Sequence, residues 1–166
     1  MARRSAGSKQ SAGTPATVAL TRAGIPFASH TYEHDPLVTS FGVEAARELG
    51  VEADRVFKTL LADADSRLVV GILPVTRQLD LKALASAVGA KRASLADPAL
   101  AERKTGYVVG GISPIGAKTR LTTVLDASAT AFETIYVSGG RRGFDVELTP
   151  ADLLLVTQGR SAAIAR

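Results

Sequence analysis

The chain contains no cysteine and no tryptophan, and only two of its 166 residues are histidines. The absence of cysteine excludes disulfides, thiolate metal sites and a cysteine nucleophile supplied by the protein. Two histidines leave little material for a Ser-His-Asp triad or a three-histidine zinc site. If their segment is extended, His30, Tyr32 and His34 share one face and could form part of a metal site. No third ligand is indicated nearby, so we expect neither a metal nor another cofactor.

Long apolar segments are missing as well, since no run approaches the ~20 residues that cross a bilayer. The first residues, "MARRSAGSKQSAG", lack the apolar region of a secretory signal. We therefore expect a cytoplasmic protein without a membrane partner. Hydrophobic residues make up 46% and charged residues 22%, which is typical of a globular domain. We place that domain at residues 14–166, behind a flexible basic tail at residues 1–13.

The charge of the chain is modest. The formal net charge is +4, and three of the positive charges lie in the acid-free tail, which leaves +1 for residues 14–166. A nucleic-acid partner therefore cannot be inferred from net charge alone. The pairs Lys91-Arg92, Arg103-Lys104 and Arg141-Arg142 could still form a local basic patch.

Hydrophobic periodicity and cap residues predict both helices and strands. Helices are expected after Thr14-Pro15, in "TSFGVEAARELG", "RQLDLKALASAVG" and "SLADPALAERKTG", and after Thr149-Pro150. Strands are expected in "PFASHTYEH", "RVFKTLLAD", "RLVVGILP", "YVVGGISPIGAK", "TTVLDAS" and "TIYVSGGRRGFDVELT". In the second helix, Glu44, Arg47 and Glu48 are predicted to point outward. Because the elements alternate without a regular βαβ rhythm, we expect a compact mixed α/β or α+β sheet or barrel.

Lys58 stands inside the otherwise apolar strand "VFKTLL". Alternation along a strand places it on the same face as Val56 and Leu60. One interpretation is structural: the lysine lies along apolar surface with its ammonium in water, or blocks pairing at an open sheet edge. The other is a cleft lysine that meets an anion or a developing oxyanion, where low dielectric strengthens its effect. The strand alone leaves both interpretations open.

The glycine pair in "VVGGISP" is a candidate ligand cradle. Gly110 and Gly111 would let the backbone approach a ligand closely and expose N–H donors, and Ser113 adds a hydroxyl. The alternative is a bulge or a tight turn. The segment does not match a Walker A loop, because its spacing differs from the one that motif requires.

A second glycine-rich segment, "YVSGGRRGFD", has the same two interpretations. Ser138 and Gly139 could line a pocket, or the segment could be a plain hairpin. Together with Lys58, these segments supply a cation, backbone donors and hydroxyls, but no obvious strong nucleophile or base. Such a set suits a site that binds a small anion or an ester.

Six segments, taken in order, carry a family resemblance: "HTYEHDP", "FKTLL", "QLDLKALASAVGAK", "TGYVVGGISPIGAK", "TIYVSGG" and "RGFDVEL". From about Thr14 to Arg166 the chain resembles the YbaK/EbsC family of bacterial Cys-tRNA(Pro) deacylases. The resemblance implies a mixed β-sheet curled into a barrel-like core surrounded by helices. The same fold is expected in the editing domain inserted in bacterial prolyl-tRNA synthetases.

The resemblance also implies an activity and a set of site residues. The activity is hydrolysis, in trans, of Cys-tRNA(Pro), with prolyl-tRNA synthetase as a transient partner. The substrate's own thiol would attack its ester to form a thiolactone, so the protein need not supply a nucleophile. Lys58 corresponds to the family's essential lysine, which would hold the terminal phosphate or polarise the carbonyl, while Gly110 and Gly111 would receive the negative charge. The implied substrate-binding positions are Tyr32, Thr59, Ile112, Ser113, Ser138, Gly139 and Asp145.

Asp145 and Ser138 are the candidates for binding the substrate's α-ammonium and hydroxyl groups. Two other functions remain open: a deacylase for Ala-tRNA or another small aminoacyl-tRNA, and a non-catalytic module that binds aminoacyl-tRNA or the synthetase. Pocket volume would decide between these substrates, since one methylene is worth only about 1–3 kcal/mol of discrimination and a thiol-dependent mechanism rejects alanine chemically. The nearly neutral domain predicts modest affinity for tRNA alone, with selectivity supplied by the synthetase.

Overall fold

Two β-sheets organise the structure, a computed structural model that describes residues 13–166. The three-stranded sheet is antiparallel and has the order β1 (Ala28–Thr31), β7 (Phe144–Leu148), β6 (Ile135–Arg141). The five-stranded sheet has the order β4 (Ala93–Leu95), β2 (Phe57–Ala64), β3 (Arg67–Pro74), β5 (Thr122–Asp126), β8 (Arg160–Ala162). In it β2 pairs antiparallel with β3 and β4, whereas β5 pairs parallel with β3 and β8.

The mixed α/β class is confirmed, but the barrel-like core is not, because the described strands form two open sheets. The edge strands of the five-stranded sheet, β4 and β8, are three residues long and lie at opposite ends of the strand order. Closure would require these two strands to pair. The two sheets meet instead at an isolated parallel bridge between Val56 and Tyr136.

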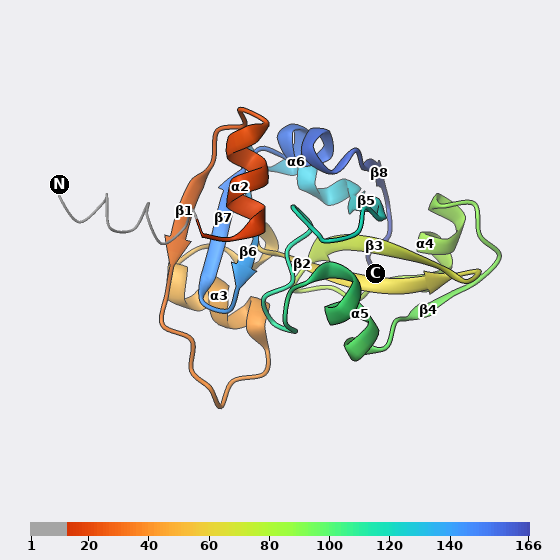
Figure 1. Ribbon diagram of the computed structural model, residues 1–166, viewed down its shortest axis with the longest axis horizontal. Coiled ribbons are helices and arrows are strands. Elements are labelled where there is room, and N and C mark those ends of the chain that lie inside the picture. The colour runs from red at the N-terminus through yellow and green to blue at the C-terminus, as the bar shows by residue number, and fades with distance from the viewer. Residues whose placement is uncertain (1–12) are drawn as a thin grey trace, which may run out of the picture.

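Within residues 13–166, five α-helices surround the sheets (Figure 1). Their bounds are α2 (Pro15–Arg22), α3 (Phe41–Leu49), α4 (Leu81–Ala87), α5 (Pro98–Thr105) and α6 (Pro150–Thr157), with 3-10 turns η1 (Ala53–Arg55) and η2 (Ala127–Ala131). In Figure 1, α2 lies along the three-stranded sheet, and α4 lies toward the far end of the other sheet. None of the helices in residues 13–166 has the length and apolar character that a membrane crossing requires.

The predicted helix ends are confirmed by side-chain caps. Thr14 Oγ1 accepts a hydrogen bond from Thr17 N at the start of α2, and Thr149 Oγ1 accepts one from Asp152 N at the start of α6. Gly50 ends α3 with a left-handed φ of 69°, a conformation that favours glycine. Most of the predicted tail, residues 1–12, lies outside the described residues.

Three local predictions differ from the structure. The segment "YVVGGISPIGAK" forms turns and irregular loop in place of a strand, since its glycines and proline interrupt sheet pairing. The strands β4 and β8 have no signal in the sequence, because each is short and depends on its neighbours in the sheet. The helix predicted from Arg77 begins only at Leu81, because Asp80 caps it by accepting a hydrogen bond from Ala83 N.

Apolar side chains cover both faces of the five-stranded sheet. On β3, Val70 and Ile72 belong to the larger core cluster, which also holds α2 and the three-stranded sheet, whereas Val69 and Leu73 pack into a second cluster with α4. Burial on both faces explains why β2 and β3 read as nearly continuous apolar runs. A charged residue on such a strand therefore needs a specific reason.

Candidate active site

A cavity of about 490 Å³ lies where β2 begins, between the N-terminal half of α3, the loop after α5 and the three-stranded sheet. Most of the predicted site residues line it, although they come from five separate segments of the chain. These residues are Tyr32, Lys58, Thr59, Gly110, Ile112, Ser138 and Asp145. The remaining lining is largely apolar.

The structure places the other three predicted residues outside this lining. Gly111 packs against backbone, since an added Cβ would lie 2.7 Å from Arg141 Cα. Gly139 lies under the ring of Phe144, which an added Cβ would approach to 2.3 Å. Ser113 is buried beside a neighbouring cavity of about 210 Å³, and its Oγ accepts a hydrogen bond from Ile115 N.

Lys58 is half-buried at the cavity wall, opposite Leu73 in the β2–β3 ladder. Burial lowers the pKa of its ammonium below the ordinary lysine value. Among residues 13–166 its Nζ forms no ion pair. The strand β4 pairs with β2 only at Ala62–Ala64, so the strand order does not by itself decide between an edge role and a cleft role for Lys58. Its place in the cavity lining favours the cleft role. The arrangement presents a cation on a rigid strand to whatever enters the cavity.

Asp145 is the buried acid of the site, with 6% of its surface exposed. Burial raises the pKa of its carboxyl to about 7, so the group changes charge near neutral pH. It pairs with His30 and Ser138 through the backbone ladders of β7, and its carboxylate has no ion-pair partner in residues 13–166. A buried carboxyl that lines a cavity is suited to bind a cationic or hydrogen-bonding group of a ligand.

Two hydroxyls flank these charged groups. Tyr32 lines the cavity, and burial followed by the nearby charge of Asp145 raises the pKa of its phenol, which keeps it protonated. Thr59 Oγ1 is buried without a hydrogen-bond partner in the described residues, and Thr59 lines both cavities. An unpartnered buried hydroxyl is costly unless a ligand or water completes it.

Glu44 was predicted to point outward from α3, and this is wrong. Its side chain is 1% exposed and accepts hydrogen bonds from His34 Nδ1 at 2.7 Å and from Asp35 N at 2.8 Å. Burial opposes its ionisation, but these hydrogen bonds and nearby positive charge outweigh it and hold the pKa of Glu44 below its ordinary value. Glu44 thereby fixes the chain that leads into the cavity wall. The helical periodicity of the sequence did not predict this orientation, because the hydrogen-bond partners of Glu44 lie in the loop before the helix.

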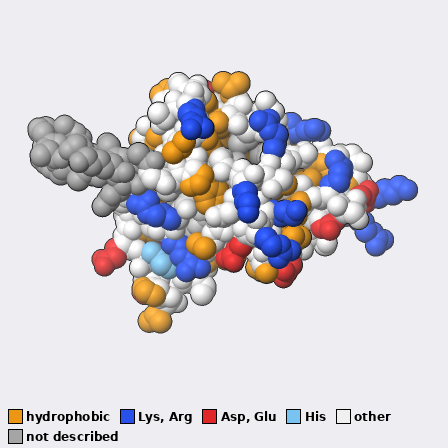
Figure 2. All heavy atoms as spheres, viewed as in Figure 1, with side chains coloured by type: hydrophobic (Ala, Val, Ile, Leu, Met, Phe, Trp, Pro, Cys, Tyr) orange, Lys and Arg blue, Asp and Glu red, His pale blue; other side chains and the backbone are white. Residues whose placement is uncertain are grey.

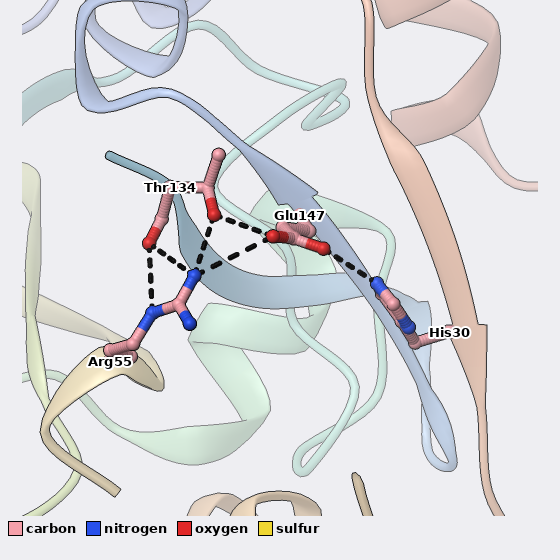
Figure 3. Close-up of polar contacts among 4 residues, drawn as sticks. All are labelled: His30, Arg55, Thr134 and Glu147. Carbon is pink, nitrogen blue, oxygen red and sulfur yellow. Dashed lines mark hydrogen bonds and ion pairs between the residues drawn. The ribbon is translucent and has the colours of Figure 1, made fainter. Parts of the chain in front are cut away.

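His30 has a separate partner, Glu147, and takes part in a network that joins the two sheets (Figure 3). Arg55, just before β2, donates to Thr134 O and Thr134 Oγ1, and Thr134 Oγ1 donates to Glu147 Oε2. His30 Nε2 lies 2.9 Å from the other oxygen of that carboxylate. The network fixes the start of β2, and hence Lys58, relative to the three-stranded sheet.

The metal interpretation of the two histidines gains no support from this geometry. His30 and His34 are each engaged by a different glutamate. Within residues 13–166 no three His, Cys, Asp or Glu side chains are grouped as metal ligands.

A model of the aminoacyl-tRNA editing domain matches residues 34–155, which include every residue that lines the cavity except Tyr32. The chain belongs to the aminoacyl-tRNA editing domain family. The predicted YbaK/EbsC relationship is confirmed, because the chain is 41% identical over 120 residues to EbsC of Enterococcus faecalis, covering 72% of this chain and 73% of that protein. The name of EbsC assigns it Cys-tRNA(Pro)/Cys-tRNA(Cys) deacylase activity.

Other relatives are also named as a tRNA deacylase or as a proline–tRNA ligase. ProXp-y of Escherichia coli K12, named a multifunctional Ser/Thr-tRNA deacylase, is 31% identical over 140 residues and 84% of each chain. The proline–tRNA ligase of Moorella thermoacetica matches over 68 residues at 35% identity, covering 41% of this chain and 12% of the ligase. The prediction of an aminoacyl-tRNA-editing enzyme related to prolyl-tRNA synthetase editing domains is therefore confirmed.

A solved structure supports the fold of the editing domain. The crystal structure described as a trans-editing enzyme for prolyl tRNA synthetase superimposes with a TM-score of 0.78, covering 92% of this chain and 95% of that chain at 24% identity. At this identity the likeness concerns the fold alone.

Proposed function

We propose that this editing domain hydrolyses mischarged Cys-tRNA(Pro) in trans, and that the substrate thiol begins the reaction. The observation that carries the proposal is the half-buried Lys58 ammonium on the wall of a cavity whose lining has hydroxyl groups but no cysteine nucleophile and no histidine to activate a hydroxyl. Neither a cysteine nor a histidine lines that cavity. The similarity to EbsC supports the choice of cysteine as the esterified amino acid.

The proposed reaction has two steps. The substrate sulfur loses its proton and attacks the ester carbonyl carbon, and the carbonyl oxygen becomes an oxyanion. Collapse of this intermediate breaks the bond to the ribose oxygen, which takes up a proton, and leaves a cysteine thiolactone. Water then opens the thiolactone to free cysteine. The protein contributes by positioning the thiol and by stabilising the oxyanion, which accounts for most of the rate in reactions of this type.

Five residues of the cavity have a proposed part in this scheme. Lys58 stabilises negative charge, either on the carbonyl oxygen or on the terminal phosphate. Asp145, when ionised, binds the α-ammonium of the substrate, and Ser138 binds a hydroxyl. Tyr32 and Thr59 are proposed to complete the wall around the amino-acid side chain, where the unpartnered Thr59 Oγ1 can meet a polar group.

The second candidate is a deacylase for seryl- or threonyl-tRNA, which the similarity to ProXp-y favours. Under this alternative a water molecule attacks the ester, and Thr59 Oγ1 would hydrogen-bond the substrate hydroxyl. The two candidates differ in the role of the thiol, since replacing sulfur by a hydroxyl removes the nucleophile of the first scheme but keeps the size of the substrate.

A single-turnover assay with Cys-tRNA(Pro), Ser-tRNA(Pro) and Ala-tRNA(Pro) tests the proposal. We expect rapid hydrolysis of Cys-tRNA(Pro) and little hydrolysis of Ser-tRNA(Pro) or Ala-tRNA(Pro). Rapid hydrolysis of Ser-tRNA(Pro) would favour the second candidate. Equal hydrolysis of all three esters would refute the thiol-dependent route. Binding of the aminoacyl-tRNAs without turnover would identify a non-catalytic binding module.

The proposed partner is prolyl-tRNA synthetase, which would supply selectivity for the tRNA. Lys and Arg side chains are spread over the face seen in Figure 2, with acidic side chains between them, and do not form one continuous stripe. Such a surface predicts weak binding of free tRNA. Tight binding of proline tRNA at physiological salt, with a steep dependence on salt concentration, would contradict this proposal.

A further inference from the structure

In the turn at Val108–Gly111, the peptide N–H groups of Val108 and Gly110 have no hydrogen-bond partner among the described residues, and of these two residues only Gly110 lines the larger cavity. Gly111 N donates to Val108 O over 2.8 Å, which closes the turn. Gly110, its third residue, has a φ of 89°, and Val109 is not among the residues with positive φ. This combination defines a type II turn, whose third position favours glycine. Within residues 13–166, Gly110 N donates no hydrogen bond.

The central peptide of this turn can face in two ways. Type I and type II turns differ by a flip of that peptide, which reverses both its C=O and its N–H. Because the peptide is planar and trans, Val109 C=O and Gly110 N–H point in opposite directions. Val109 and Gly110 both line the 490 Å³ cavity. The orientation therefore decides whether a carbonyl or an N–H donor faces a ligand.

Arg142, an exposed residue in the turn between β6 and β7, fixes this orientation. Its Nε donates to Val109 O over 2.8 Å, and its guanidinium carbon lies 5.1 Å from the centre of the Phe41 ring. The same ring occupies the space beside Gly110, where an added Cβ would lie 2.7 Å from it. On the preceding peptide, Glu102 Oε2 accepts a hydrogen bond from Val109 N at 2.8 Å.

We propose that Arg142 is a positioning residue for deacylation. Its hydrogen bond holds Val109 O away from the cavity, so that Gly110 N–H faces the cavity and donates to the ester carbonyl oxygen of the substrate. The identity of that oxygen rests on the proposed function, whereas the orientation of the turn is a property of this chain alone. A different role for an exposed arginine, attraction of the polynucleotide, depends on charge and weakens with salt.

Two substitutions separate the hydrogen bond from the charge. In Arg142→Gln, the side-chain nitrogen stands at the same number of bonds from Cα as Nε, so the donor is kept and the charge is lost. In Arg142→Met, both the donor and the charge are lost at similar length. Arg160→Met is the matched control, because Arg160 is also exposed and donates to a main-chain carbonyl, that of Ala87, away from the cavity.

The rate constant and KM for deacylation are measured for these proteins at two salt concentrations. We expect Arg142→Met to lower the single-turnover rate constant about tenfold with little change in KM, because the Gly110 N–H remains but is no longer held toward the oxyanion of the transition state. Arg142→Gln should stay within about threefold of wild type, and Arg160→Met should match wild type. A charge effect predicts a different result: Arg142→Gln and Arg142→Met would raise KM equally, and the increase would become smaller at high salt. That result would overturn the proposal.

A second measurement does not depend on activity. The backbone amide signal of Gly110 and its rate of hydrogen exchange report the orientation of the turn. We expect both to change in Arg142→Met and to be retained in Arg142→Gln. Unchanged Gly110 signals in Arg142→Met would overturn the positioning role. If wild type hydrolyses none of the esters, the proposed function fails, and these signals still decide whether Arg142 orients the turn.

Discussion

Lys58 and Gly110 reach the same cavity from two regions that are built in opposite ways. Lys58 lies on β2, whose eight residues all pair with β3, so the backbone ladder itself places the side chain. Gly110 lies in a turn outside the sheets that individual side chains hold through single hydrogen bonds and one aromatic contact. The strand therefore tolerates loss of a side chain, whereas the turn depends on each of its supports.

Replacement of Lys58 tests the strand and should have the largest effect on activity. Lys58→Ala is expected to lower the single-turnover rate by about 10²–10³-fold, as loss of one oxyanion-stabilising group does. The free energy of unfolding should change by no more than about 0.5 kcal/mol, because the ladder does not use the ammonium. Chemical denaturation beside the rate assay checks both, with Lys82→Ala on α4 as the control. Unfolding of Lys58→Ala would return Lys58 to a structural role.

Replacement of Gly110 tests the turn and should affect both activity and stability. In Gly110→Ala the added Cβ meets the Phe41 ring, and the alanine backbone must keep an unfavourable positive φ. We therefore expect about 10–100-fold lower activity and a loss of about 1–3 kcal/mol in the free energy of unfolding. Gly24→Ala is the matched control, since Gly24 has a φ of 69° with open space around its Cβ. Equal losses in the two variants would show that backbone strain, and not the contact with Phe41, limits the turn.

The raised pKa of Asp145 predicts that the stability of the protein depends on pH. Its pKa of about 7 lies above the value of an unfolded aspartate, so the folded protein holds a proton that the unfolded chain releases. The stability of the wild type should therefore fall as pH rises from about 4 to about 7. Asp145→Asn should remove this slope and be the more stable protein at pH 8.

The same substitution should weaken substrate binding. If the ionised Asp145 carboxylate binds the α-ammonium, Asp145→Asn raises KM about tenfold at pH 8, since a charged hydrogen bond is replaced by a neutral one. Denaturation at pH 5 and pH 8, with KM at pH 8, checks both effects. A parallel stability profile in the two proteins would contradict the raised pKa of Asp145.

Glu44 should have the smallest effect on activity, because it acts on the chain before α3 and not on the cavity directly. Its lowered pKa means that its contribution to stability is present above the pKa of an unfolded glutamate and is lost as pH falls through the folded value. Glu44→Gln should cost about 1–2 kcal/mol at pH 7 and less at pH 3. Thermal unfolding at both pH values checks this, with the more exposed Glu48→Gln as the control. A loss that is the same at both pH values would exclude the charge of Glu44 as its cause.

Local sequence signals determined much of the framework. The threonine-proline starts of α2 and α6, the glycine end of α3 and the apolar runs of β2 and β3 were all predicted, because each depends on neighbouring residues. The resemblance of several segments to an editing family also pointed to seven residues that line the cavity, because those residues stand within the segments that carry it. The alternation that set Lys58 apart on an apolar strand was visible in six residues.

Only the tertiary structure decided the features that depend on distant partners. The five-stranded sheet stays open because its end strands β4 and β8 do not pair with each other in the described residues, which no local pattern encodes. Glu44 turns inward because His34 and the backbone of Asp35 meet it, and the pKa of Asp145 rises because segments far apart in the chain bury it. The hydrogen bond between Arg142 and Val109 likewise joins residues 33 positions apart. Burial and charge depend on which segments come together, and that is settled only when the chain has folded.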